Sequence, residues 1–258
     1  MSEPPELPPE LTHPEPVAAG RPWGVWATIG WSLLIVIASL AAQIVVAAIV
    51  AVVTARGGRI DAESLSSDGN VLAMATCASG LVALALTVFF AWLRRGIDLK
   101  TYLALRLPTQ REFSRWFICL LLLVLATDAA SALLSRPIVP EVMIEIYENS
   151  DWARPVLWLA ILVMAPLSEE FFFRGFLFAG LQQSRLGSLG TVLITSVLWA
   201  VIHLQYDIYG IAVIFLAGLV LGFARVKTSS LWLCVILHSL MNVIAMIELL
   251  TYLSVVEK

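Results

Sequence analysis

Long apolar runs, interrupted by short polar segments, occupy most of the chain from residue 23 onward. Each run is long enough to cross a hydrocarbon layer of about 30 Å. Because lipid offers no hydrogen-bond partners to a bare backbone, such runs must form helices. The predicted spans are residues 23–55, 70–93, 115–135, 152–184, 188–205, 208–225 and 230–253. We therefore predict an all-α, polytopic transmembrane helical bundle of about seven spans, or eight if 152–184 splits at Pro166.

Basic residues between the spans predict the orientation of the chain. The segment between the second and third spans carries Arg94, Arg95, Lys100, Arg106, Arg111 and Arg115. Positive charge favours the cytoplasmic side, so this segment is expected there. If 152–184 is a single crossing, the N-terminus lies in the cytoplasm and the C-terminus outside. The acidic segment between the third and fourth spans then also lies outside.

Composition supports a membrane protein and removes several other classes. The chain is 60% hydrophobic and only 14% charged, whereas a soluble domain is about 25% charged. A soluble enzyme, a secreted disulfide scaffold and a nucleic-acid binder are therefore excluded. The net charge of −3 gives no basic excess for a polyanionic partner. The expected surroundings are the lipid bilayer, and the expected location is the inner membrane of a bacterium as an integral, multi-pass protein.

The chain divides into a tail, a first group of helices and a second group. Residues 1–22 hold seven of the twelve prolines and four glutamates, which predicts a disordered cytoplasmic tail. Residues 23–150 hold transmembrane helices in which we find no motif. Residues 151–253 hold most of the ionisable residues that fall inside the spans, and function is sought there because such residues are costly in lipid.

The densest polar group inside a span is Glu169-Glu170-Phe-Phe-Phe-Arg174. Glu170 and Arg174 are four residues apart, share a helix face and are predicted to form an ion pair. Glu169 then has no cation near it in the sequence, which is the profile of a general base. The alternative is a buried charge network that only ties helices together.

Two further polar pairs have helical i, i+4 spacing. Trp199 and His203 share a face of the fifth span, and His238 and Asn242 share a face of the seventh. An imidazole or an amide can stabilise a developing oxyanion. Both pairs are equally compatible with interhelical hydrogen bonding.

Together the three groups resemble the CPBP family, which contains the CAAX prenyl endopeptidases and the bacterial Abi-type proteins. The order is Glu-Glu-x-x-x-Arg, then aromatic-x-x-x-His, then His-x-x-x-Asn, each on a separate span. The resemblance covers about residues 152–245 and implies that 151–253 form a protease core. The second motif departs from the pattern, because its usual Phe is Trp199 here.

The resemblance implies roles for the individual residues. Glu169 would activate the attacking water and His203 would help to hold it. His238 and Asn242 would stabilise the oxyanion of the tetrahedral intermediate. Glu170, Arg174 and Trp199 would support the site. The implied substrate is a membrane-anchored or lipidated protein, with a prenylated one as the family-level expectation.

The resemblance leaves the cofactor open between zinc and no metal. If a metal binds, Glu169, His203 and His238 are the expected ligands, because Glu and His are zinc ligands in proteins. The chain has no His-Glu-x-x-His helix, which a zinc protease of that type requires.

Two other functions fit the same residues. One is a non-catalytic membrane immunity or interaction protein, in which the polar cluster only binds. The other is an ion-coupled transporter, although the chain shows no internal repeat of the kind common in transporters.

Overall fold

The computed structural model describes residues 20–54 and 68–256, and within these residues every regular element is helical. Nearly all of the predicted N-terminal tail lies outside the described residues. The longer helices are α1 (Val25–Thr54), α3 (Gly69–Leu93), α5 (Gln110–Leu133), α10 (Gly187–Val201), α11 (Ile208–Thr228) and α12 (Leu231–Val256). The shorter ones are α4 (Leu99–Leu103) and α6 (Glu141–Glu148). These helices form the predicted polytopic bundle.

The fourth predicted span is one continuous helical run, Arg154–Gln182. It consists of α7 (Arg154–Leu159), a π-helical stretch (Ala160–Met164), α8 (Ala165–Glu170), a second π-helical stretch (Phe171–Leu177) and α9 (Phe178–Gln182). The run therefore does not split at Pro166. In a π-helical stretch the backbone N–H of residue i+5 donates to the carbonyl of residue i, and such stretches are often found at functional sites.

Six helical runs are long and apolar enough to cross a membrane in the described part of the chain. The fifth predicted span is shorter than expected, because α10 ends at Val201 instead of continuing to residue 205. Its 15 residues extend only about 22 Å at 1.5 Å per residue. The prediction of about seven spans thus holds as six full-length helices and one short helix.

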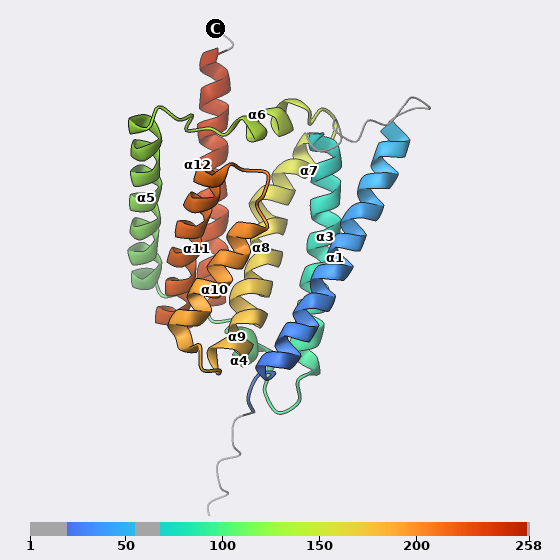
Figure 1. Cartoon of the computed structure of the whole chain (residues 1–258), viewed down its shortest axis with the longest axis vertical. Helices are drawn as coiled ribbons and strands as arrows, with labels where there is room; N and C mark the ends of the chain where they lie inside the picture. Colours follow the sequence, from blue (N-terminus) through green and yellow to red (C-terminus); the bar gives the residue numbers. More distant parts are fainter. Residues whose placement is uncertain (1–19, 55–67, 257–258) are drawn as a thin grey trace, which may run out of the picture.

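The helices run side by side, and α6 lies across one end of the bundle (Figure 1). The described part begins at the end that holds α4 and the α9–α10 connection, and α12 carries the C-terminus beyond the opposite end (Figure 1). Local capping fixes several helix starts: Asp68 caps α3, Asp207 caps α11, and Thr109 with Glu112 forms a capping box on α5.

One hydrophobic core joins the N-terminal helices to residues 151–253. Ile35, Phe90 and Leu120 pack in the same buried cluster as Phe176 and Leu237. Close backbone approach is also built into this core. A Cβ on Gly222 of α11 would lie 2.8 Å from Val192 of α10, and one on Gly218 would lie 3.0 Å from Ser196. The Gly-x-x-x-Gly pair therefore brings α10 and α11 into close contact.

A close helix approach in the core, between α9 and α1, gives a test of the packing. A Cβ on Gly180 of α9 would lie 2.0 Å from Oγ1 of Thr28, which is fully buried on α1. We expect Gly180→Ala to lower the free energy of unfolding by about 1–3 kcal/mol, because overpacking a core costs that much. Gly30→Ala is the matched control, since a Cβ there meets nothing within 4 Å. Thermal unfolding in detergent measures both variants, and equal midpoints would contradict the packing described.

Candidate functional site

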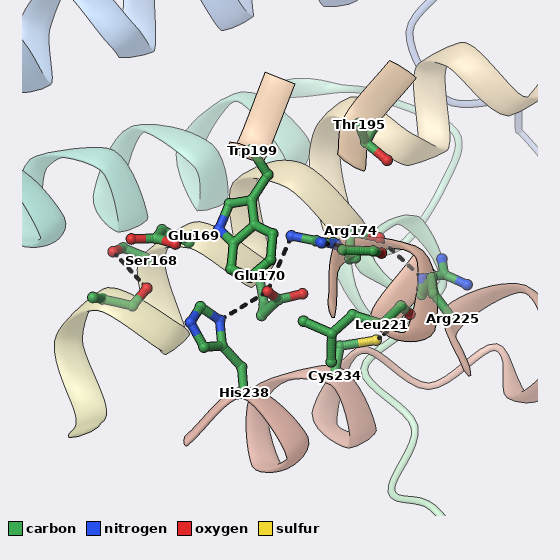
Figure 2. A network of polar contacts seen from close by, with 12 residues as sticks. Ser168, Glu169, Glu170, Arg174, Thr195, Trp199, Leu221, Arg225, Cys234 and His238 are labelled. Atoms are coloured by element: carbon green, nitrogen blue, oxygen red, sulfur yellow. Dashed lines mark hydrogen bonds and ion pairs between the residues drawn. The ribbon is translucent and has the colours of Figure 1, made fainter. Parts of the chain in front are cut away.

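The polar side chains of four helical segments meet in the middle of the bundle. Glu169 and Glu170 come from α8, Arg174 from the π-helical stretch that follows, and Trp199 from α10. His238 comes from α12, and Figure 2 shows its imidazole and the Glu169 carboxylate beside the Trp199 indole. Two neighbouring glutamates on one helix turn thus point into different surroundings.

Glu170 lies at the centre of a sealed ion-pair network. Its Oε1 accepts a hydrogen bond of 3.1 Å from Nη1 of Arg174 and one of 3.0 Å from Nδ1 of His238. Glu170 and Arg174 are both 0% exposed, and His238 is 3% exposed. The predicted i, i+4 ion pair is present. Since charge burial is tolerated only when charges are paired, these three residues depend on one another.

Arg174 makes further contacts that hold it in place. Its Nη2 donates to the carbonyl of Gly218 at 3.4 Å, and its guanidinium lies 4.7 Å from the centre of the Trp199 ring. The backbone carbonyl of Arg174 in turn accepts a hydrogen bond of 3.0 Å from Nε of Arg225.

Arg225 makes a contact that the sequence did not predict. It is the last residue of the predicted sixth span, 208–225. In the structure α11 continues to Thr228, and Arg225 is 7% exposed, with its guanidinium over the ring of Phe178. Its hydrophobic neighbours in the sequence gave no sign that the side chain turns inward, because the partner carbonyl lies 51 residues away.

Glu169 is partly exposed and is held by a different partner. Oε2 of Glu169 accepts a hydrogen bond of 2.6 Å from Nε1 of Trp199. The sequence assigned Trp199 only a packing role, so this bond is new information. The indole binds Oε2, so the other carboxylate oxygen of Glu169, Oε1, is not part of this hydrogen bond.

The two histidines flank the same indole. The His203 and His238 rings lie 5.3 and 5.1 Å from the Trp199 ring, centre to centre, both edge-on. Nδ1 of His203 is 2.8 Å from the Trp199 carbonyl, which can only accept, so Nδ1 carries the proton. Nδ1 of His238 faces a carboxylate and is protonated for the same reason. Each histidine therefore keeps Nε2 for another partner.

Asn242 contacts the site helix away from the two glutamates. Its Nδ2 donates to the carbonyl of Ile161 at 2.8 Å. In a π-helical register that carbonyl would accept from the N–H of residue 166, but Pro166 has none. Asn242 supplies the missing donor from α12, one turn after His238. The structure thus brings Glu169, Trp199, His203 and His238 together, whereas Asn242 contacts the same helical run at Ile161 and uses one N–H there.

The arrangement does not form a metal site in the described residues. No group of three or more His, Cys, Asp or Glu side chains there is close enough to hold a metal ion. Glu169, His203 and His238 surround the indole, and each already has a hydrogen-bonded partner. These residues do not fit a three-ligand zinc site as they stand.

Comparison with known proteins identifies the part of the chain that carries the motifs. Residues 151–244 match the family model described as type II CAAX prenyl endopeptidase Rce1-like. The resemblance to the CPBP family is therefore confirmed for this region. An uncharacterized 24.3 kDa protein of Escherichia coli is 37% identical over 82 residues, which are 31% of this chain and 38% of that protein. No solved structure matches the chain.

Proposed function

We propose that this multi-pass membrane protein is an intramembrane endopeptidase that hydrolyses a peptide bond in a membrane-associated protein. The observation that carries the proposal is the contrast between two adjacent carboxylates. Glu170 is fully buried and paired with Arg174, whereas Glu169 is partly exposed and has a neutral partner. A carboxylate that is not neutralised by a cation and that water can reach suits a general base.

The proposed reaction begins with a water molecule between Glu169 and Nε2 of His203. Oε1 of Glu169 takes a proton from this water as the oxygen attacks the carbonyl carbon of the scissile bond. The Trp199 indole fixes the carboxylate through Oε2, so Oε1 has a defined direction. The proton then passes from Glu169 to the nitrogen of the leaving amine, which yields a carboxylic acid and an amine.

The oxyanion formed by the attack needs hydrogen-bond donors. His238 is one proposed donor, because the Glu170 carboxylate 3.0 Å from its Nδ1 fixes the orientation of the imidazole ring. The second N–H of the Asn242 amide is the other proposed donor, because the first is bonded to Ile161. Hydrogen-bond donors that are fixed before the reaction stabilise the transition state most when water is excluded from the site. His238 meets this condition, because its side chain is buried.

Asn242 has a structural role as well as the proposed catalytic one, and a pair of variants separates them. We expect Asn242→Ala to lower the free energy of unfolding by about 1–3 kcal/mol, because the Ile161 carbonyl loses its donor. Adding Pro166→Ala returns a backbone N–H to the helix and is expected to restore much of this stability. If Asn242 stabilises the oxyanion, cleavage stays about 100- to 1,000-fold slower in the double variant.

Thermal unfolding and a cleavage assay in proteoliposomes measure the two effects separately. Pro166→Ala alone is the control and is expected to keep both stability and cleavage. Recovery of full activity together with stability in the double variant would show that Asn242 only supports the helix.

The substrate's lipidation and the role of a metal are separate parts of the proposal. A prenylated protein is the expectation that comes with the family resemblance. Elemental analysis of the purified protein, combined with chelator treatment, tests the metal: stoichiometric zinc lost together with activity would overturn the metal-free mechanism described here.

A further inference from the structure

A cavity of about 370 Å³ lies where α6, the start of α7 and the last turns of α12 meet. This is the end of the bundle that α6 crosses (Figure 1). The cavity is lined by Tyr147, Glu148, Arg154, Leu250, Leu253 and Ser254. Small-molecule sites in proteins have volumes of about 300–1,000 Å³, so this cavity is large enough to hold a ligand.

Arg154 is a cation that has no anionic partner. Its guanidinium lies over the ring of Tyr147, 4.6 Å from the ring centre. Among the described residues no carboxylate lies within ion-pairing distance of it, and its Nε is buried without a hydrogen-bond partner. A buried N–H that stays unpaired is costly, and a guanidinium binds the oxygens of an anion through several N–H groups at once. Arg154 therefore brings an unused anion-binding group to the cavity.

Glu148 brings a negative charge to the same cavity. Its side chain is exposed at the last residue of α6, and it forms no ion pair with Arg154 although both residues line the cavity. Two opposite charges that border one space without meeting are complementary to a ligand that carries both charges. The anion of such a ligand belongs beside Arg154 and its cation beside Glu148.

The surroundings of the cavity select against a ligand with a net negative charge. Three further exposed carboxylates lie close to Glu148 in the sequence: Glu141, Glu145 and Asp151. Like charges repel one another and opposite charges attract. A ligand whose negative charge is balanced by an ammonium group is therefore favoured over one that carries the negative charge alone.

The apolar wall of the cavity indicates that the ligand is a lipid. Leu250 and Leu253 of α12 are half-buried in this wall, and Ile247 is 58% exposed. Positions 247, 250 and 254 share one face of α12, so an apolar strip leads from the cavity toward the middle of the helix. Trp152, just before α7, is 57% exposed. Tryptophan collects where lipid headgroups meet hydrocarbon, which places the cavity at headgroup depth.

We propose that this cavity binds the headgroup of a phospholipid that carries a phosphate and a primary ammonium, as phosphatidylethanolamine does. The phosphate binds the guanidinium of Arg154, and the ammonium faces Glu148. The acyl chains lie along the α12 strip that contains Ile247. A lipid bound in this way contacts α6, α7 and α12 together, so its binding stabilises the folded protein.

The proposal is tested on the delipidated full-length protein in detergent micelles. Dioleoyl phosphatidylethanolamine, phosphatidylglycerol and phosphatidylcholine are added in separate samples, and water-soluble O-phosphorylethanolamine in a fourth. Native mass spectrometry measures the bound lipid, and the thermal unfolding midpoint measures the stabilisation. We expect phosphatidylethanolamine to bind about tenfold more tightly than phosphatidylglycerol, which offers no ammonium to Glu148.

Two variants assign the charged contacts. Arg154→Gln is expected to weaken phosphatidylethanolamine binding about 10- to 100-fold, because a charge-assisted hydrogen bond to the phosphate is lost. Glu148→Lys is expected to reverse the preference in favour of phosphatidylglycerol, because the ammonium then meets a cation. Glu148 is exposed, so this variant tests the site even if Arg154→Gln does not fold. Glu145→Lys is the matched control, since Glu145 is exposed on α6 but does not line the cavity.

Three results would contradict the proposal. Equal binding of the three lipids to the wild-type protein, or an unchanged preference in Glu148→Lys, would overturn the assigned headgroup. Equal stabilisation by O-phosphorylethanolamine would overturn the lipid, because the ligand would then be a soluble phosphate ester. These measurements do not involve peptide hydrolysis, so their outcome is independent of the proposed function.

Discussion

Arg174→Met is expected to be the most destabilising single substitution of a charged side chain in the protein. The change leaves the Glu170 carboxylate buried without its arginine, although His238 still contacts it. Removing one member of a buried ion pair costs about 3–5 kcal/mol, because the other charge stays in a low-dielectric interior. Thermal unfolding in detergent, or the yield of folded protein, measures the loss.

A second variant separates charge from packing at this position. In the double variant Glu170→Gln/Arg174→Met no unpaired charge remains, so we expect it to recover much of the lost stability. Arg185→Met is the matched control, because Arg185 is exposed at the α9–α10 connection. Arg174→Met with wild-type stability would mean that the buried network contributes little to the fold.

Glu169→Gln is expected to have the opposite profile, with cleavage lost and the fold kept. The amide has the same shape as the carboxylate, and its oxygen can still accept from the Trp199 indole 2.6 Å away. It cannot take a proton from water, and the loss of a general base slows a reaction by about 100- to 10,000-fold. Unfolding midpoints close to wild type and a slowed reaction in proteoliposomes are therefore expected together.

Glu248→Gln is the control for this substitution. Glu248 is also a partly buried carboxylate in a membrane helix, but it lies ten residues after His238 on α12. The Glu248→Gln variant should cleave substrate at the wild-type rate. Equal rates for Glu169→Gln and wild type would remove Glu169 from the mechanism.

The sequence predicted those parts of the site that depend on neighbouring residues. The Glu170–Arg174 ion pair follows from a four-residue spacing on one helix, and the structure contains it. The spans follow from the length of the apolar runs. Both are local properties, which a periodic pattern records directly.

Contacts between distant segments were not predictable in this way. The partner of Glu169 is 30 residues away, on α10, and the donor to the Ile161 carbonyl is 81 residues away, on α12. Nothing in the local pattern marks a π-helical register, although Pro166 was a sign that a donor would be missing. The early end of α10 depends on the turn at residues 202–206, whose apolar residues resemble a continued helix in the sequence.

The two carboxylates also show why one pattern allowed several functions. In the sequence Glu169 and Glu170 are equivalent neighbours that suit a protease, a binding protein or an ion-coupled transporter. Their surroundings differ in the structure, since one is sealed in an ion-pair network and the other is partly exposed. A cluster that only holds the helices together would not need one carboxylate to be buried and the other to be partly exposed. A protease does, because its general base must contact water.

The most direct test of the proposed hydrolysis compares the N-termini of membrane proteins in two otherwise identical cell populations. One makes the wild-type protein and the other makes Glu169→Gln at the same level. The proposal predicts internal N-termini that are present with the wild-type protein and missing with Glu169→Gln. An identical set of N-termini in both populations would contradict it.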